Sequence, residues 1–119
     1  MKFTDRLKEL NIQPETYIKI VKNIASNKGY NANNLTFSKN PNYKLSYTIG
    51  DRNVNFGSTP YSDYIIYLKK AEDGLLSDKQ AEEHRRRYLS RALKIKGNWK
   101  ENNTSRNYLA ISILWDGKV

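Results

Sequence analysis

The chain has 119 residues, of which 38% are hydrophobic, and its 21 lysines and arginines exceed its 12 aspartates and glutamates to give a net charge of +9. This length predicts one domain with a modest core and little room to line a deep substrate cavity, and the lack of cysteine excludes disulfides, thiol catalysis and thiolate metal sites. The positive charge favours an anionic partner such as nucleic acid, an acidic protein surface or anionic lipid. No stretch approaches the ~20 apolar residues of a membrane span or resembles a signal peptide, so we expect a soluble protein without a membrane partner.

The first 29 residues predict a helical hairpin. The segment from Thr4 to Leu10 predicts a short helix with Thr4 as its N-cap and Asn11 as its stop. A second helix is expected to begin at Pro14 and to close just before Gly29, because apolar side chains recur at helical spacing between them.

Residues 35–57 predict a small antiparallel sheet. Tyr43–Ile49 alternates apolar and polar side chains, as a half-buried strand does. Gly50–Asp51 supplies a turn, and Asn53–Phe56 continues the alternation as a partner strand. Leu35–Phe37 is a candidate for a further short strand, so the sheet has two or three strands.

The rest of the chain predicts helices, with two ambiguous segments. Residues 61–67 are dense in aromatic side chains and fit either a strand or the start of a helix. Ser77 and Gln80 form a capping-box pattern, and the helix that they begin is expected to run as far as Gly97. Residues 107–115 fit a buried strand or a helix; we prefer the helix because the segment has end signals on both sides, at Ser105 and Gly117.

These elements predict one α+β domain over residues 1–119. It comprises the helical hairpin over 1–29, the small sheet over 35–57, and a basic helix, a connector and a terminal apolar helix over 77–117.

Catalytic and metal sites have little support in the sequence. The one histidine, His84, falls far short of the three or four ligands that zinc requires, and no phosphate-binding glycine loop or nucleophile elbow is present. The carboxylates that a metal-dependent nuclease would need are Asp51, Asp63, Glu72 and Asp73. Asp63 is the best candidate, but we expect it to hydrogen-bond a turn or to pair with a basic residue. We therefore predict no enzyme activity, no metal and no cofactor.

The strongest functional signal is a basic segment in the C-terminal third. From His84 to Arg106, with Glu101 as the one acidic residue among them, lie eight positive residues that we predict to bind an anionic partner: Arg85, Arg86, Arg87, Arg91, Lys94, Lys96, Lys100 and Arg106. On a helix, Arg87, Arg91 and Lys94 would form one basic ridge. With DNA, seven phosphate contacts would give a slope of log K against log salt of about −6, without base specificity. A solvated helix face is the alternative interpretation.

Aromatic residues add a second, weaker signal. Tyr61, Tyr64 and Tyr67 are able to stack on the bases of a single strand. Clustered tyrosines next to a sheet more often belong to the core, so both interpretations stay open.

An ordered run of aromatic and glycine anchors extends over about three quarters of the chain. Its segments are Gly29–Tyr30, Leu35–Ser38, Tyr43–Tyr47, Val54–Gly57, Tyr61–Tyr67, Arg86–Arg91, Ile95–Lys100 and Ser105–Trp115. This run resembles a family of short, largely uncharacterised proteins of large DNA viruses and tailed phages.

The resemblance implies a structural protein of the virion, such as a minor or auxiliary capsid protein or a portal-vertex component of a bacteriophage or virus. Its partners would be capsid or portal subunits, and its location the virion, with the host cytoplasm during assembly. The resemblance carries no catalytic residues and does not predict an oligomeric state. The alternative function is a non-specific nucleic-acid-binding accessory protein that contacts DNA phosphates.

Overall fold

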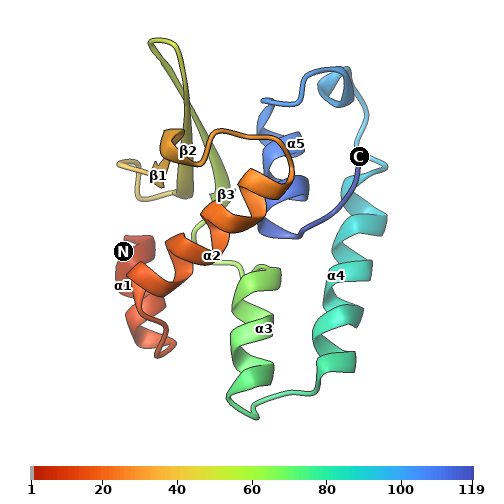
Figure 1. The fold of residues 1–119 in the computed structure, drawn as a ribbon. Helices are drawn as coiled ribbons and strands as arrows, with labels where there is room; N and C mark the ends of the chain where they lie inside the picture. Colours follow the sequence, from red (N-terminus) through yellow and green to blue (C-terminus); the bar gives the residue numbers. More distant parts are fainter. Residues whose placement is uncertain (1) are drawn as a thin grey trace.

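The computed structural model describes residues 2–119 and confirms the predicted α+β class (Figure 1). The elements in chain order are α1 Phe3–Glu9, α2 Pro14–Asn27, η1 Ala32–Asn34, β1 Leu35–Phe37, β2 Tyr43–Ile49, β3 Arg52–Ser58, α3 Tyr64–Glu72, α4 Asp78–Ala92, η2 Trp99–Glu101, α5 Arg106–Leu109 and η3 Ala110–Leu114. The predicted third strand is present, and the strand order is β1-β2-β3.

The sheet is antiparallel throughout, with Leu35 opposite Tyr47 and Leu45 opposite Phe56. A tight turn at Gly50 and Asp51 joins β2 to β3, as predicted, and Gly50 adopts a left-handed backbone with φ of 61°. The prediction of a half-buried β2 is wrong, because four successive residues, Lys44 to Tyr47, are all buried. Elements packed on both faces of the sheet cause this burial.

The N-terminal helices agree with the sequence except at one boundary. The structure starts α1 at Phe3, with Lys2 rather than Thr4 in the N-cap position and no side chain capping the helix. Asn11 has the left-handed φ of 59° that ends the first helix, and Gly29 has a φ of 89° just after α2. Both helix stops therefore lie where the sequence predicted, and both have the left-handed backbone that commonly ends a helix.

The aromatic segment over residues 61–67 is the start of a helix. Asp63 is the N-cap of α3, and its Oδ1 atom accepts a hydrogen bond from the amide of Ile66 at 3.0 Å. The predicted capping box of α4 is present, with the Ser77 hydroxyl and the Gln80 side chain each bonding the other's backbone. The expected run of this helix to Gly97 is wrong.

The fourth helix ends at Ala92, where the helical hydrogen bonds give way to tighter turns. The amides of Lys94 and Ile95 bond the carbonyls of Arg91 and Ala92 at 3.2 Å each, as in a tight turn. The indole of Trp99 then donates to the carbonyl of Ile95 at 2.9 Å, where a helical amide would otherwise bond. Lys94 therefore lies beyond the helix.

The C-terminal apolar segment is helical, as preferred over the strand. The Ser105 hydroxyl accepts from the amide of Tyr108, which confirms the predicted cap. The helix widens into the π-helix η3, whose five residues are all buried. The amide of Gly117 closes the segment by bonding the carbonyl of Ile111 at 2.8 Å.

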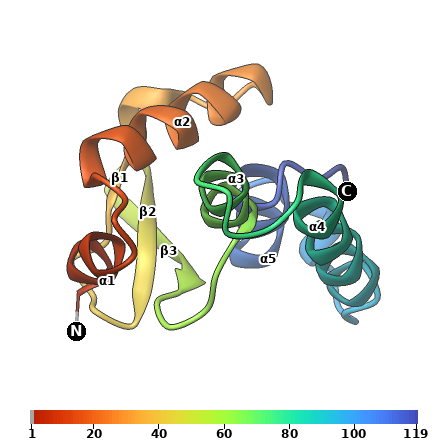
Figure 2. The ribbon, with the colours of Figure 1, turned by 90° about the horizontal axis from the view of Figure 1, so that it is seen from below.

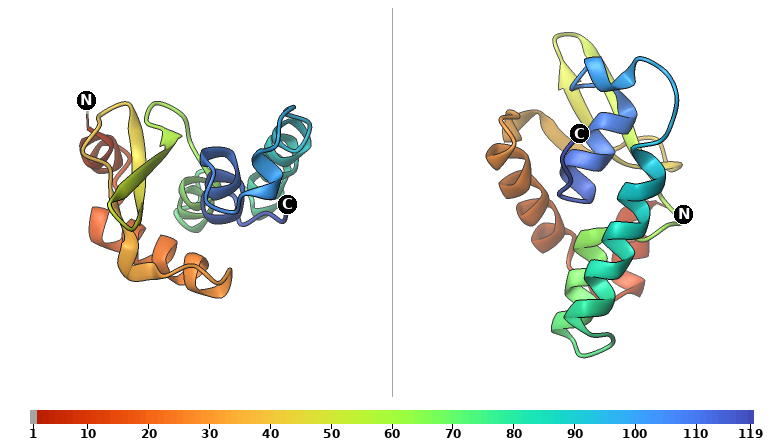
Figure 3. Two further views of the ribbon diagram at one scale, coloured as in Figure 1. Left: turned by 90° about the horizontal axis from the view of Figure 1, so that it is seen from above. Right: turned by 90° about the vertical axis from the view of Figure 1, so that its right-hand side faces the viewer.

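This C-terminal helix lies in the middle of the molecule. Seen from below, the sheet with α1 and α2 lies on one side, α4 lies on the other, and α3 and α5 with its extension lie between them (Figure 2). The view from above shows the same order (Figure 3). One hydrophobic core includes residues of both sides and of the central helix. No helix within residues 2–119 has both the length and the apolar character needed to cross a membrane.

Candidate anion-binding cleft

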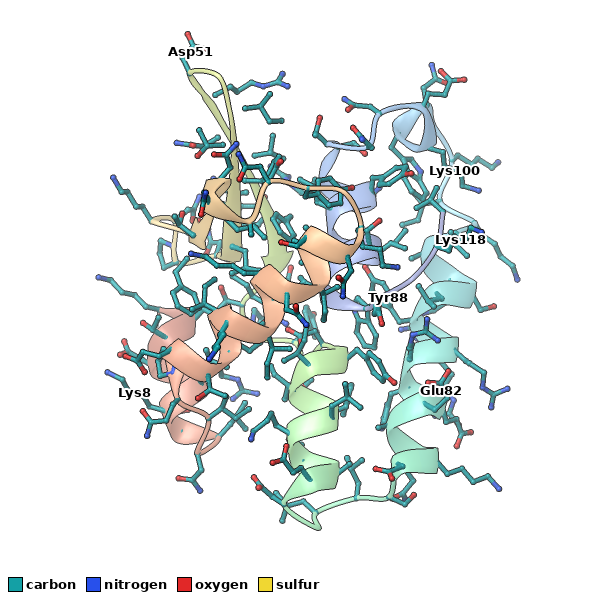
Figure 4. All side chains as sticks on the ribbon, viewed as in Figure 1. Lys8, Asp51, Glu82, Tyr88, Lys100 and Lys118 are labelled. Carbon is teal, nitrogen blue, oxygen red and sulfur yellow. The ribbon has the colours of Figure 1, made fainter. Side chains whose placement is uncertain are left out.

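The predicted basic residues divide into three groups in the structure. Arg87, Arg91 and Arg106 line one open cleft of about 560 Å³. The other exposed residues of the set, which do not line this cleft, are Arg86, Lys94, Lys96 and Lys100. Figure 4 shows Lys100 on the segment beyond the end of α4. The predicted ridge is therefore incomplete, since Lys94 leaves the helix that carries Arg87 and Arg91.

Arg85 differs from its neighbours because its guanidinium is used inside the molecule. It donates to the carbonyls of Trp115 at 2.9 Å and Asp116 at 2.7 Å, and its NH1 pairs with Glu82 at 3.0 Å. The same group lies 5.4 Å from the ring of Tyr64. Arg85 thus holds the C-terminal segment against α4, and we leave it out of the candidate binding surface.

Five parts of the chain build the cleft around the three arginines. Strand β2, the end of β3 with the following loop, α3, α4 and the C-terminal helix each contribute to its lining: Tyr43, Lys44, Gly57, Ser58, Tyr61, Ser62, Tyr67, His84, Arg87, Tyr88, Arg91, Arg106, Asn107, Ala110, Leu114 and Trp115. The sequence predicted little room for a deep cavity. The cleft exists because α4 stands apart from the sheet, with the C-terminal helix as the floor between them.

The lining carries strong positive charge. It contains three arginines and Lys44, and it contains no aspartate or glutamate. The charge of Lys44 is neutralised by an ion pair in which its Nζ atom lies 2.8 Å from the Oδ2 atom of Asp63. The charge offered to a ligand is therefore that of the arginines.

The three arginines are differently constrained. The Nε of Arg106 donates to the carbonyl of Asn55 at 2.8 Å, and its guanidinium lies 4.6 Å from the centre of the Tyr43 ring. Arg87 pairs with Glu83 at 2.7 Å, with both side chains largely exposed. Arg91 makes no hydrogen bond or ion pair to another side chain within residues 2–119.

Stacked aromatic pairs form one wall of the cleft. Tyr88 and Trp115 stack with ring centres 4.1 Å apart, and Tyr67 stacks on His84 at 4.0 Å. Figure 4 shows Tyr88 directed from α4 toward the interior. Burial raises the pKa of the Tyr88 hydroxyl, and the charge of Arg91 opposes this shift, so the phenol stays neutral at ordinary pH. Because it stacks on Tyr67, His84 is a half-buried packing residue, which is the interpretation that the sequence favoured.

Unlike the stacked aromatic residues of the cleft, Tyr61 is exposed to solvent. Its side chain is 72% exposed, on the loop between β3 and α3. Its backbone is held by a bond from its amide to the carbonyl of Ser58 at 3.3 Å. Tyr64 and Tyr67 are half-buried, so the core interpretation holds for them but not for Tyr61.

Asp63 has the structural role that the sequence favoured over a nuclease site. Besides capping α3, its Oδ2 accepts from the Tyr17 hydroxyl at 2.6 Å and from Lys44 at 2.8 Å. Asp51 lies at the tip of the β2–β3 turn (Figure 4), and Glu72 pairs with Lys69 at 3.4 Å. Among residues 2–119, no three carboxylate or histidine side chains gather in a metal-ligand arrangement.

No family model, curated protein or solved structure matches the chain. The function is therefore inferred from the cleft itself, and the resemblance to viral proteins stays a prediction.

Proposed function

We propose that the protein binds nucleic acid without catalysis, and that the cleft of Arg87, Arg91 and Arg106 holds the phosphates. One observation carries this proposal: three arginines from two separate helices line a single cleft that contains no aspartate or glutamate. Like charges gathered in this way repel one another, and an anionic ligand removes that repulsion. A guanidinium also offers forked donors that match the oxygens of a phosphate.

The existing contacts of these arginines leave them available. The ion pair between Arg87 and Glu83 is exposed, so it stabilises the fold by about 1 kcal/mol or less and exchanges readily for a phosphate. Arg106 uses its Nε on the backbone, which leaves its terminal nitrogens for a ligand. Arg91 has no competing partner among the residues that the structure describes.

The geometry also sets the expected salt dependence. Three phosphate contacts give a slope of log K against log salt of roughly −2 on a single strand and −3 on duplex DNA. Contacts from Lys94, Lys96 and Lys100, which do not line the cleft, would steepen it toward the value of about −6 expected for the whole basic segment.

The test is a fluorescence-anisotropy titration of a labelled oligonucleotide at several salt concentrations. We expect the triple variant Arg87→Ala, Arg91→Ala and Arg106→Ala to lose most of the affinity and about two to three units of the salt slope. Arg52→Ala, at the exposed start of β3, removes the same kind of charge away from the cleft and is expected to change little. Salt-independent binding, or equal losses in Arg52→Ala and in the single variant Arg91→Ala, would refute the proposal.

A role in the virion is the second candidate. It is favoured by the resemblance and by a second basic surface after α4, where Lys94, Lys96 and Lys100 accompany Ile95, which is 47% exposed. Cations around an exposed apolar side chain suit docking on an acidic capsid or portal subunit. Mass spectrometry of purified virions tests this role: a fixed copy number supports it, and absence from the particles rejects it.

A further inference from the structure

Tyr61 is the one tyrosine lining the cleft whose ring has no aromatic or cationic partner within residues 2–119. The ring of Tyr43 lies under Arg106, Tyr67 is stacked on His84, and Tyr88 is stacked on Trp115. A ring that is 72% exposed beside a basic cleft has a face available to another flat group.

The loop that carries Tyr61 is held at both ends. At one end the Thr59 hydroxyl donates to the carbonyl of Pro41 at 2.6 Å, and the Thr59 amide donates to the carbonyl of Asn42 at 3.1 Å. At the other end, Asp63 is fixed by Lys44 and by the Tyr17 hydroxyl. The backbone of Tyr61 is therefore positioned before any ligand arrives, which lowers the entropy cost of binding.

From this arrangement, and on the basis of the proposed function, we propose that the cleft is selective for unpaired nucleotides, with Tyr61 stacking on a base while Arg87, Arg91 and Arg106 hold the flanking phosphates. A cleft of about 560 Å³ has the size of an ordinary small-ligand site, which suits a nucleotide rather than the width of a duplex. In a duplex, each base face is already covered by its neighbours. Only a nucleotide with an unpaired base is able to stack its base on Tyr61 while the arginines hold its phosphates.

The experiment compares three DNA ligands at one salt concentration: a single-stranded oligothymidine, a duplex of equal length, and a single strand of equal length with abasic sites, which keeps the phosphates but lacks the bases. The wild-type protein is expected to bind the oligothymidine roughly 5- to 150-fold more tightly than the abasic strand, as one stacked base contributes. It is also expected to prefer the single strand over the duplex.

Tyr61→Ala is expected to lose the preference for the oligothymidine over the abasic strand, whereas Tyr61→Phe keeps it. Arg91→Ala serves as the contrast, because it removes a phosphate contact and is expected to lower the affinity for all three ligands by a similar factor. Since Tyr61 is mostly exposed, its variants should retain the wild-type melting temperature and circular dichroism spectrum.

The outcomes separate the two proposals. If the wild-type protein binds all three ligands equally in a salt-dependent way, or if Tyr61→Ala keeps the preference, the inference about Tyr61 is overturned and the proposed function stands. If no DNA binds even at low salt, the proposed function fails and the inference fails with it. The comparison of oligothymidine with the abasic strand in the wild-type protein tests whether bases contribute to binding, and Tyr61→Ala tests whether that contribution comes from Tyr61.

Discussion

The ammonium group of Lys44 lies 2.8 Å from the Oδ2 atom of Asp63, and their side chains are 2% and 1% exposed. The same Oδ2 atom accepts from the Tyr17 hydroxyl, and the other carboxylate oxygen caps α3. This buried network joins β2, α2 and α3, and it fixes the loop that carries Tyr61.

Removing the cation of this pair should be costly. We expect Lys44→Met to lower the free energy of unfolding by about 3–5 kcal/mol, because it leaves Asp63 as a buried charge without a counterion. Denaturant titration measures this loss. Lys39→Met, at an exposed position, should change stability by less than about 0.5 kcal/mol. The double variant with Asp63→Asn should lose less than the sum of the two single losses, and simple additivity would contradict the coupling.

The Tyr17 hydroxyl predicts a distinctive pH dependence. Burial, and then the charge of Asp63 and their hydrogen bond, raise the pKa of Tyr17 well above its ordinary value of 10.0. The unfolded chain therefore releases this proton near pH 10 while the folded protein keeps it, so the stability that Tyr17 contributes is complete below pH 10 and is lost as the pH rises above it.

Tyr17→Phe isolates this contribution. It should cost about 2 kcal/mol near neutral pH, because Asp63 loses a buried hydrogen-bond donor. The difference from wild type should stay constant up to about pH 9 and shrink above pH 10, as measured by unfolding titrations across that range. A difference that does not change with pH would show that the phenol ionises equally in both states.

Gly57 should tolerate no side chain, for two separate reasons. It has a φ of 80°, and an added Cβ would lie 2.6 Å from the Cδ1 atom of Leu114. Gly74 has nearly the same φ, 77°, with open space around it. We expect Gly74→Ala to cost about 1 kcal/mol for backbone strain alone, and Gly57→Ala to cost about 2–4 kcal/mol because the clash adds to it. Equal melting temperatures for the two variants would argue against close packing of β3 on η3.

Arg85 and Arg86 are adjacent in sequence but should have different effects. Arg85→Ala removes the charged donor of two C-terminal carbonyls and should lower the free energy of unfolding by about 2 kcal/mol. Arg86→Ala removes the same charge at an exposed position and should change stability by less than about 0.5 kcal/mol. Thermal unfolding of the two variants provides the comparison, and an equal loss in both would contradict the anchoring role of Arg85.

Local patterns in the sequence determined most of the elements. The period of α2, the alternation of β2 and β3, and the capping box of α4 are each set by residues within one or two turns of one another. The sequence also contains the signal for the N-cap role of Asp63, because an aspartate directly precedes the apolar run that forms α3. The positive charge of the C-terminal third is read directly from its lysines and arginines and does not depend on the fold.

Tertiary packing decided the site. The sequence grouped Arg87 with Lys94 by helical spacing, but α4 ends at Ala92, and in the segment beyond it the Trp99 indole bonds the carbonyl of Ile95. Arg106, 15 residues after Arg91, reaches the same cleft only because the C-terminal helix packs between the sheet and α4.

Lys44 is buried against the carboxylate of Asp63, 19 residues further along the chain. Arg85 bonds the carbonyls of Trp115 and Asp116, which follow the C-terminal helix. Local propensity determines where a helix or strand forms, whereas the partner of a charged side chain is set by which elements meet in space. For that reason the sequence by itself determined the elements and the total charge, and only the tertiary structure decided which arginines line a cleft and which stabilise the fold.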